Sequence, residues 1–244
     1  MTPRVFILGI PIDAVRLSHV LERMRWMLAD ARQHHVMTPN PEMLVAAQTN
    51  TAFYNVLLAS SLNVPDGFGL VLASRFLSSP LPGRVTGVDV VTEFCRQTKE
   101  PVFFLGAGEG IAARTATVLK ENNPSLVIAG TFSGSPAEDH EDAIIERINA
   151  SGARVLFVAY GAPIQDLWIA QNLKKMMTVK IAMGVGGTFD FLAGVRRRAP
   201  VFVRSLGLEW LWRLFHEPKR MKRIFTAVVV FPYLVLRSRW SRRV

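Results

Sequence analysis

Polar side chains suited to chemistry follow short apolar runs at several points of the sequence. The segment Thr38-Pro-Asn-Pro-Glu42 comes directly after the run His34–Met37, and its prolines fix the backbone around Thr38 and Asn40. Further along, a Pro-Asp-Gly turn carries the carboxylate of Asp66, where rigid neighbours can hold it against a substrate. Each segment has an ordinary alternative, because Thr38 and Asn40 also suit a helix cap and Asp-Gly is a common turn pair.

Two later loops bring polar side chains to the same kind of place. Gln165 and Asp166 lie in a loop that follows the apolar run Val155–Ala159, and Asp190 ends the glycine-rich loop that starts at Gly184. Ligands of open α/β sheets bind at the carboxyl ends of the strands, so these loops are expected to share one edge. A capped helix start explains either loop alone, but the two together favour a cleft.

A glycine-rich turn follows the run Val102–Leu105, where a strand would meet a helix. Backbone amides and the helix dipole can receive a phosphate there, and Gly106 best suits a close backbone approach. A dinucleotide site would place an acid after the next strand, but residues 126–131 end in Ala-Gly-Thr. Nicotinamide binding is therefore disfavoured, a nucleotide remains open, and a plain tight turn is the alternative.

The sequence offers few metal ligands. It contains one cysteine, Cys95, no Asp-x-Asp motif, and 5 histidines with neither metal-ligand spacing nor a paired nucleophile. Asp139-His140 falls in the first turn of an expected helix, where the acids around it complement the helix dipole. We therefore expect no bound metal and no cofactor, and the single cysteine suits a reducing compartment.

The elements that must position these residues alternate regularly. Short apolar runs separated by helical segments predict an α/β domain with a Rossmann-like, mostly parallel sheet flanked by helices. The expected strands are 5–10, 102–105, 126–129, 155–159 and 179–183. Among the helices, Ile111–Asn122 follows the glycine-rich turn, and Pro136–Ala150 begins with Ser135 as its cap.

Charge divides the 244-residue chain unevenly. Residues 1–195 hold 16 Lys and Arg against 17 Asp and Glu, whereas residues 196–244 hold 13 against 2 and account for the net charge of +10. We place a boundary here, between an α/β domain (1–195) and a basic, aromatic helical appendage (196–244). The appendage suits an anionic partner, which charge alone leaves as nucleic acid, a membrane surface or a phosphorylated substrate.

The appendage has the composition of a segment that lies at a membrane surface. Residues 206–223 are predicted to form a helix that interleaves aromatic side chains with arginine, followed by a break at Pro218 and a basic cluster. The apolar run 224–236 is shorter than the ~20 residues of a spanning helix and is expected to add membrane anchoring. Nucleic-acid binding is the rival, but the slightly negative charge of the body argues against it.

A series of motifs, taken in order, resembles the WecG/TagA/CpsF glycosyltransferase family: TPNPEM, PDGFG, GRVTGVD, FFLGAGEG, VAYGAPIQDLW, GVGGTFDFLAG, RRRAP and LGLEWLWRLFHEPKR. The likeness runs from about residue 5 to residue 223. It implies an inverting, metal-independent transfer of N-acetylmannosamine, its uronic acid or a related sugar from a UDP donor. The implied acceptor is undecaprenyl-diphosphate-linked N-acetylglucosamine, used in teichoic acid, common antigen and capsule synthesis.

The same resemblance assigns roles to individual residues. Asp66 would be the general base that takes a proton from the acceptor hydroxyl. The sugar and donor pocket would be lined by Thr38, Asn40, Gln165 and Asp190. Gly106, from the glycine-rich turn, and Glu209 are further substrate-binding candidates. Since no metal is expected, the charge of the departing UDP would be stabilised by arginines that fold over the pocket when the appendage meets the membrane, namely Arg213, Arg220 and Arg223. Ile164 and Asp166 depart from the family pattern, which bears on donor selectivity.

These expectations together place the protein in the cytoplasm, peripheral on the inner face of the plasma membrane. The apolar run 5–10 is too short for a signal-peptide core, which argues against export. Association into a homo-oligomer is compatible with the motifs. The alternatives are a nucleic-acid-binding module that uses the basic tail and a nicotinamide-dependent oxidoreductase.

Overall fold

A six-stranded, fully parallel sheet forms the centre of the computed structural model, which describes residues 3–216 and 220–241. The strand order is β4-β3-β8-β7-β5-β6, and every pair of neighbours runs in parallel. The strands are β3 (His34–Met37), β4 (Leu62–Asn63), β5 (Val102–Gly106), β6 (Ile128–Phe132), β7 (Val155–Ala159) and β8 (Ile181–Gly184). The predicted α/β class is confirmed.

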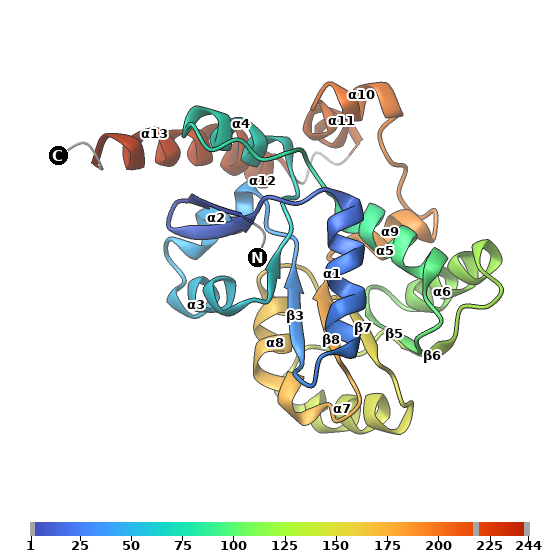
Figure 1. Cartoon of the computed structure of the whole chain (residues 1–244). Coiled ribbons are helices and arrows are strands. Elements are labelled where there is room, and N and C mark those ends of the chain that lie inside the picture. The colour runs from blue at the N-terminus through green and yellow to red at the C-terminus, as the bar shows by residue number, and fades with distance from the viewer. Residues whose placement is uncertain (1–2, 217–219, 242–244) are drawn as a thin grey trace.

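Helices cover both faces of the sheet (Figure 1). Phe104 and Phe157 point to the face covered by α1, α5 and α6, while Phe103 and Leu156 point to the face covered by α7 and α8. Burial on both faces explains why the strands read as unbroken apolar runs. The helices are α1 (Leu17–Ala29), α2 (Pro41–Ala47), α3 (Thr51–Ala59), α4 (Phe68–Phe76), α5 (Gly87–Gln97), α6 (Ile111–Asn122), α7 (Glu141–Ala150), α8 (Ile164–Asn172) and α9 (Thr188–Leu192), with single 3-10 turns η1 (Glu138–His140) and η2 (Leu173–Lys175).

The first apolar run does not join this sheet, so the prediction of one strand over residues 5–10 is wrong. The chain instead turns back at Leu8 and Gly9, whose φ angles are 52° and 81°. The turn joins β1 (Arg4–Ile7) and β2 (Ile10–Asp13) into a separate antiparallel hairpin. Two successive positive φ angles suit a two-residue hairpin turn, and glycine adopts the second one without a steric penalty.

Of the two helices predicted in the α/β domain, one has the predicted bounds and the other starts later than predicted. Helix α6 begins and ends at the predicted residues, after Gly110 with a φ of 73°. The expected helix from Pro136 starts late, because a 3-10 turn precedes α7. The Ser135 hydroxyl accepts a hydrogen bond from the Ala137 N–H at 3.3 Å, so it caps this short turn and not the α-helix.

The described part of the C-terminal segment (residues 196–216 and 220–241) contains α10 (Val201–Ser205), α11 (Glu209–His216), α12 (Met221–Phe225), the π-helical turn η4 (Thr226–Val230) and α13 (Phe231–Ser241). The helix expected from Leu206 starts only at Glu209, since Gly207 adopts a φ of 75°. Phe231 and Val235 are buried in a cluster that they share with α2, α3 and the hairpin. The run 224–236 thus packs partly on the body, and the division at residue 196 stays a prediction.

In the parts of the chain that the structure covers, none of the helices combines the length and the hydrophobicity needed to span a bilayer.

Candidate active site

The candidate site lies where the loops after neighbouring strands meet. β3 sits between β4 and β8, and β8 pairs with β7 on its other side. Their carboxyl ends therefore form one edge of the sheet, the usual place for ligands in open α/β sheets. Two of the loops are joined directly, because the Asp66 N–H donates to the carbonyl of Pro39 at 2.9 Å. The turn after β4 is thus fixed against the turn after β3.

Asp66 lies half-buried at this edge, against the start of helix α5. Its Oδ2 accepts a long hydrogen bond, 3.4 Å, from the N–H of Gly87, the first residue of α5. The partial positive charge of a helix N-terminus attracts an acidic side chain placed this close to it. Gly67 follows with a φ of 119°, and a side chain there would meet Pro41 at 2.9 Å. The position of Asp66 is therefore tightly determined.

Thr38 is buried beside the same helix start. Its hydroxyl donates to the carbonyl of Gly184 at 3.4 Å, which links the ends of β3 and β8. A Cβ atom added at Gly87 would lie 3.8 Å from the Thr38 hydroxyl and 3.2 Å from that of Thr188. Two hydroxyls therefore lie beside the backbone that binds the Asp66 carboxylate. The structure thus brings Thr38 and Asp66 to the same helix start.

Asn40 and Gly106 have the structural roles that the sequence analysis gave as alternatives to ligand binding, a helix cap and a tight turn. The Asn40 side chain caps α2, accepting from the N–H of Met43 at 3.0 Å. Gly106 has a φ of 100°, and a Cβ there would lie 2.8 Å from the backbone of Ala159 on β7. The Ala107 N–H donates to the Ala159 carbonyl at 3.1 Å. Gly106 also lies on β5, apart from the Asp66 loop, so a substrate-binding role for either residue stays a prediction.

Gln165 holds two loops of the edge together. Its Oε1 accepts from the N–H of Gly161, at 3.0 Å, and from the N–H of Gly186, at 2.9 Å. The side chain is 3% exposed, so the loops after β7 and β8 share a buried anchor. Asp166 beside it is fully buried, with a carboxylate oxygen 3.5 Å from the Nε2 of His35 on β3. Gln165 therefore shapes the edge through its backbone partners.

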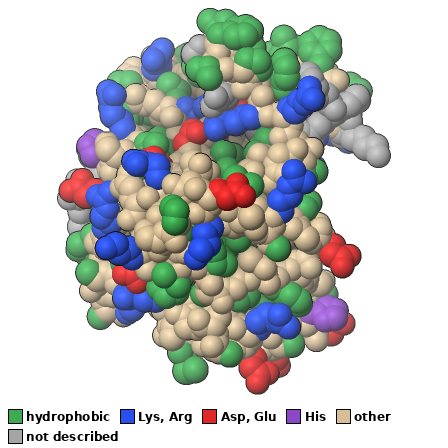
Figure 2. Space-filling view, turned by 90° about the vertical axis from the view of Figure 1, so that its right-hand side faces the viewer, with side chains coloured by type: hydrophobic (Ala, Val, Ile, Leu, Met, Phe, Trp, Pro, Cys, Tyr) green, Lys and Arg blue, Asp and Glu red, His purple; other side chains and the backbone are tan. Residues whose placement is uncertain are grey.

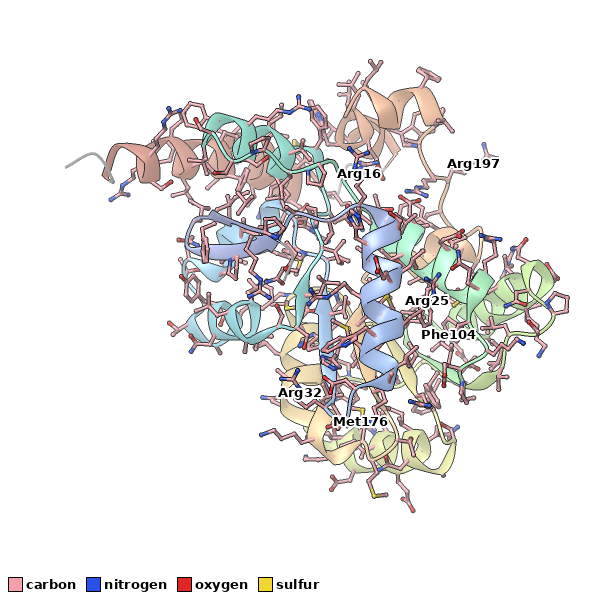
Figure 3. The ribbon with its side chains drawn as sticks, viewed as in Figure 1. Arg16, Arg25, Arg32, Phe104, Met176 and Arg197 are labelled. Carbon is pink, nitrogen blue, oxygen red and sulfur yellow. The ribbon has the colours of Figure 1, made fainter. Side chains whose placement is uncertain are left out.

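The residues that follow α9 also lie at this edge of the sheet. Asp190 pairs with Arg196 at 3.1 Å, and Arg198 pairs with Asp89 in the first turn of α5 at 2.8 Å. Arg197 between them is exposed and points away from the body (Figure 3). Asp190 is thus held by an ion pair at the rim.

Two further ion pairs fasten the C-terminal segment to the site. Glu209, the first residue of α11, pairs with Arg84 at 2.8 Å, in the loop that precedes α5. Arg223 pairs with Glu42, in the first turn of α2, at 2.5 Å. The Arg84–Glu209 pair is partly shielded from water, whereas Arg223 is exposed in its pair with Glu42. The C-terminal segment therefore crosses the carboxyl edge of the sheet (Figure 1).

The arginines predicted to bind the diphosphate, and Glu209, differ in how close they lie to the edge. Arg223 reaches the edge, where its guanidinium pairs with Glu42. Glu42 lies two residues after Asn40. Arg220 is half-buried immediately before α12. The side chain of Arg213 lies outside what the structure describes. Glu209 engages Arg84, so its expected substrate contact stays a prediction.

Arg84, Asp89 and Glu42 complete this edge, although sequence reasoning named none of them as a site residue. Arg84 and Asp89 belong to the Gly-Arg-Val-Thr-Gly-Val-Asp motif, which carried the resemblance without a role. Each pairs with a residue more than 100 positions away, at sequence separations of 125 and 109. Local patterning carries no signal for such pairs.

Other titratable groups lie away from the edge. Hollows of about 380 and 960 Å³ flank the outer side of α1 and the amino ends of the strands. His34 lines the larger hollow, and burial lowers its pKa below the ordinary value although its hydrogen bond to the Asp30 carboxylate opposes this. Burial raises the pKa of the Cys95 thiol. Within the described ranges, histidine, cysteine and acidic side chains form no group of three that could hold a metal ion.

A parallel α/β sheet with an acid, hydroxyls and glycine-rich loops at its carboxyl edge is an arrangement found in α/β enzymes, which commonly bind their substrates at that edge. The model of the "Glycosyl transferase WecG/TagA/CpsF family" matches residues 5–244, and the chain belongs to this family. It is therefore a glycosyltransferase, and the resemblance read from the motifs is confirmed.

Curated relatives share one printed name, N-acetylglucosaminyldiphosphoundecaprenol N-acetyl-beta-D-mannosaminyltransferase. The protein of Bacillus spizizenii is 34% identical over 218 residues, which cover 88% of this chain and 84% of the relative. The protein of Staphylococcus aureus strain MRSA252 is 28% identical over 243 residues, which cover 98% of this chain and 94% of the relative. The chain thus spans most of the length of both relatives.

Proposed function

We propose that this protein transfers N-acetylmannosamine, or a closely related sugar, from a UDP donor to undecaprenyl-diphosphate-linked N-acetylglucosamine, with inversion and without a metal. The printed names of the relatives support the transferred sugar and the acceptor. The observation that carries the proposal is the Asp66 carboxylate, held at the start of α5 beside Thr38 on the edge where substrates of such sheets bind.

Asp66 is the general base in this mechanism. It takes the proton of the acceptor hydroxyl while that oxygen attacks the anomeric carbon, opposite the departing diphosphate. A single displacement inverts the configuration and needs no covalent intermediate. Thr38 binds the sugar in this proposal, which is supported by the position of its hydroxyl beside the same helix start.

Fixed positive charge and backbone amides stabilise the departing UDP. Arg223 is held at the site by Glu42. The diphosphate of a bound donor would compete with this carboxylate for the guanidinium group, since phosphate oxygens are good bidentate partners of arginine. Release of Arg223 from Glu42 would then couple donor binding to a movement of α12. Arg213 and Arg220 are proposed to act in the same way.

The test of the function is UDP release in the absence of added metal. Wild-type protein is mixed with UDP-N-acetylmannosamine and an N-acetylglucosamine-diphosphate lipid, and UDP is measured with and without the acceptor. We expect release that depends on the acceptor. A panel of other UDP sugars identifies a related donor if this one is inactive. Silence with every sugar in the panel would refute the proposed function.

We also propose that the protein docks on an anionic membrane at the inner face of the plasma membrane, through its C-terminal segment. The segment exposes large apolar side chains, such as Phe202 at 67%, Phe215 at 76% and Phe225 at 57%. Figure 2 shows hydrophobic side chains gathered at the top of the molecule, where α10 and α11 lie, above scattered Lys and Arg side chains. Aromatic groups and bases in one surface suit an anionic interface. Association into homo-oligomers stays a prediction.

Replacing both Phe215 and Phe225 with serine should weaken co-sedimentation with phosphatidylglycerol vesicles about tenfold or more, because two large apolar groups leave the interface. Phe231 and Val235 are core residues, so deletion of the whole segment would expose the body and confuse the result. Met177→Ser removes an equally exposed apolar side chain, 81%, elsewhere on the surface, and serves as the control. Equal binding by all three proteins would contradict docking through this segment.

A further inference from the structure

Helix α4 exposes a row of large apolar side chains although its other face is buried. Phe68, Leu72 and Phe76 are 36%, 50% and 39% exposed, while Leu70 and Val71 pack inside. A spacing of four residues keeps the three exposed side chains on one side of the helix. We name these three residues the α4 stripe. Water-facing phenylalanine and leucine in a continuous row indicate a surface that another apolar group covers.

The α4 stripe starts at the candidate catalytic base. Phe68 is two residues after Asp66, and α4 begins at Phe68. From Phe68 to Phe76 the helix rises by roughly 12 Å at 1.5 Å per residue. An apolar chain attached to a molecule that presents its hydroxyl to Asp66 would therefore find an apolar surface leading away from the reacting atoms.

The C-terminal segment bounds the α4 stripe at both ends. The backbone at Gly207 packs on the ring of Phe68, since a Cβ added there would lie 2.6 Å from a ring carbon. At the far end, the Arg239 guanidinium stacks on the Phe76 ring, 4.4 Å from its centre. Figure 1 shows α4, α10, α11 and α13 together above the carboxyl ends of the strands. The stripe thus lies on the side of the molecule proposed to face the membrane.

A cation also lies beside the base. Arg84 lies in the loop before α5, is only 18% exposed in its side chain, and pairs with Glu209 of α11. Its neighbour Val85 donates from its N–H to the carbonyl of Pro65 at 2.9 Å, which fixes this loop against the Asp66 turn. An acid, a cation and an apolar row therefore occur close together, and these are the groups that would bind the sugar, the diphosphate and the prenyl chain of a polyprenyl-linked acceptor.

We propose that the α4 stripe binds the first isoprene units of the acceptor's polyprenyl chain. This proposal rests on the proposed function, because it takes a lipid-linked sugar as the acceptor. The stripe contributes to acceptor affinity and not to the chemical step. Bulk phospholipid is the other apolar group available, but it has no sugar at Asp66 to place its chain along this helix.

The kinetic test uses Leu72→Ser with two acceptors that share the N-acetylglucosamine diphosphate head and carry either an undecaprenyl or a methyl group. We expect KM for the undecaprenyl acceptor to rise about fivefold at unchanged kcat, because a half-exposed leucine loses its apolar contact. KM for the methyl acceptor should not change. Leu72→Met should restore the wild-type KM. Leu58→Ser on α3, where Leu58 is 42% exposed, is the matched control.

Equal KM changes with both acceptors, or no change with either, would overturn the proposal. A second measurement reads the surface without turnover. A prenyl diphosphate that carries a diazirine on its first isoprene unit is photolysed with the wild-type protein in vesicles, and the labelled peptides are mapped. Label should fall on residues 68–76 and disappear with excess unlabelled undecaprenyl phosphate.

The crosslink separates the two proposals. If wild-type protein transfers sugar to neither acceptor, the proposed function fails. The labelling alone then shows whether the α4 stripe binds a prenyl chain. Label elsewhere, or equal labelling of α4 by a diazirine phospholipid, would show that the stripe is not a prenyl site. Label confined to α4 with the prenyl probe, together with an inactive enzyme, would leave the stripe intact and exclude the sugar chemistry.

Discussion

Asp66→Asn should lower kcat by a factor of about 100 or more while KM for the donor stays near its wild-type value. A positioned general base contributes roughly 10²–10⁴-fold, and a carboxamide cannot take a proton. Asparagine has nearly the same shape, and its side-chain oxygen can still accept the hydrogen bond from the Gly87 N–H, 3.4 Å away in the wild type. The variant therefore removes the proton acceptor and keeps the turn. Steady-state UDP release checks this.

The matched control is Asp142→Asn. Asp142 is an exposed acid in the first turn of α7, so it too lies near a helix start, but it is outside the loops around Asp66. Its kcat should equal that of the wild type, and both variants should melt within a few degrees of it. A normal kcat for Asp66→Asn at equal folded protein would remove this residue from the chemistry and turn attention to another acid of the edge, such as Asp190.

Much of the site could be predicted because its signals are local. Glycine and proline beside short polar side chains mark the ends of strands, and parallel strands bring those ends to one edge. Thr38 and Asp66 lie near the same helix start for this reason, and α6 was predicted to the residue. The hairpin was missed because residues 5–10 are as apolar as a buried strand, and only Gly9 signalled the turn.

The contribution of the C-terminal segment could not be read from the sequence. A basic, aromatic composition predicts an anionic surface whether the segment stands apart or packs on the body. Phe231 is 1% exposed and lies in the core cluster of α2 and α3, which no local pattern distinguishes from the exposed Tyr233 nearby. The pairing of Glu209 with Arg84 likewise spans 125 positions. Tertiary contacts of this kind decide which arginines can reach a substrate.

The ion pairs of the C-terminal segment connect the two proposed surfaces. Glu209 joins α11 to the loop before α5, and Arg223 joins α12 to the start of α2. The helices that would meet the membrane are therefore attached to the residues that flank Asp66. Any shift of α11 or α12 on docking must strain or break these pairs, so membrane contact is mechanically linked to the edge where the diphosphate is proposed to bind.

Gly106→Ala should have the largest effect on stability, because the added methyl group meets backbone on a central strand. It would lie 2.8 Å from the carbonyl carbon of Ala159 and 3.0 Å from its oxygen, at a φ of 100°. β7 cannot move aside, since it is paired with β8 on its other edge. We expect the free energy of unfolding to fall by about 3 kcal/mol or more, and Tm by roughly 10 °C.

Gly110→Ala separates steric clash from backbone strain. Gly110 also has a positive φ, 73°, but no atom lies within 4 Å of an added Cβ. It should lose only the roughly 1–2 kcal/mol of the left-handed conformation. Urea unfolding followed by circular dichroism compares both variants with the wild type. If the two lose the same stability, the contact with Ala159 relaxes freely, and Gly106 is then better explained by a ligand that needs its bare backbone.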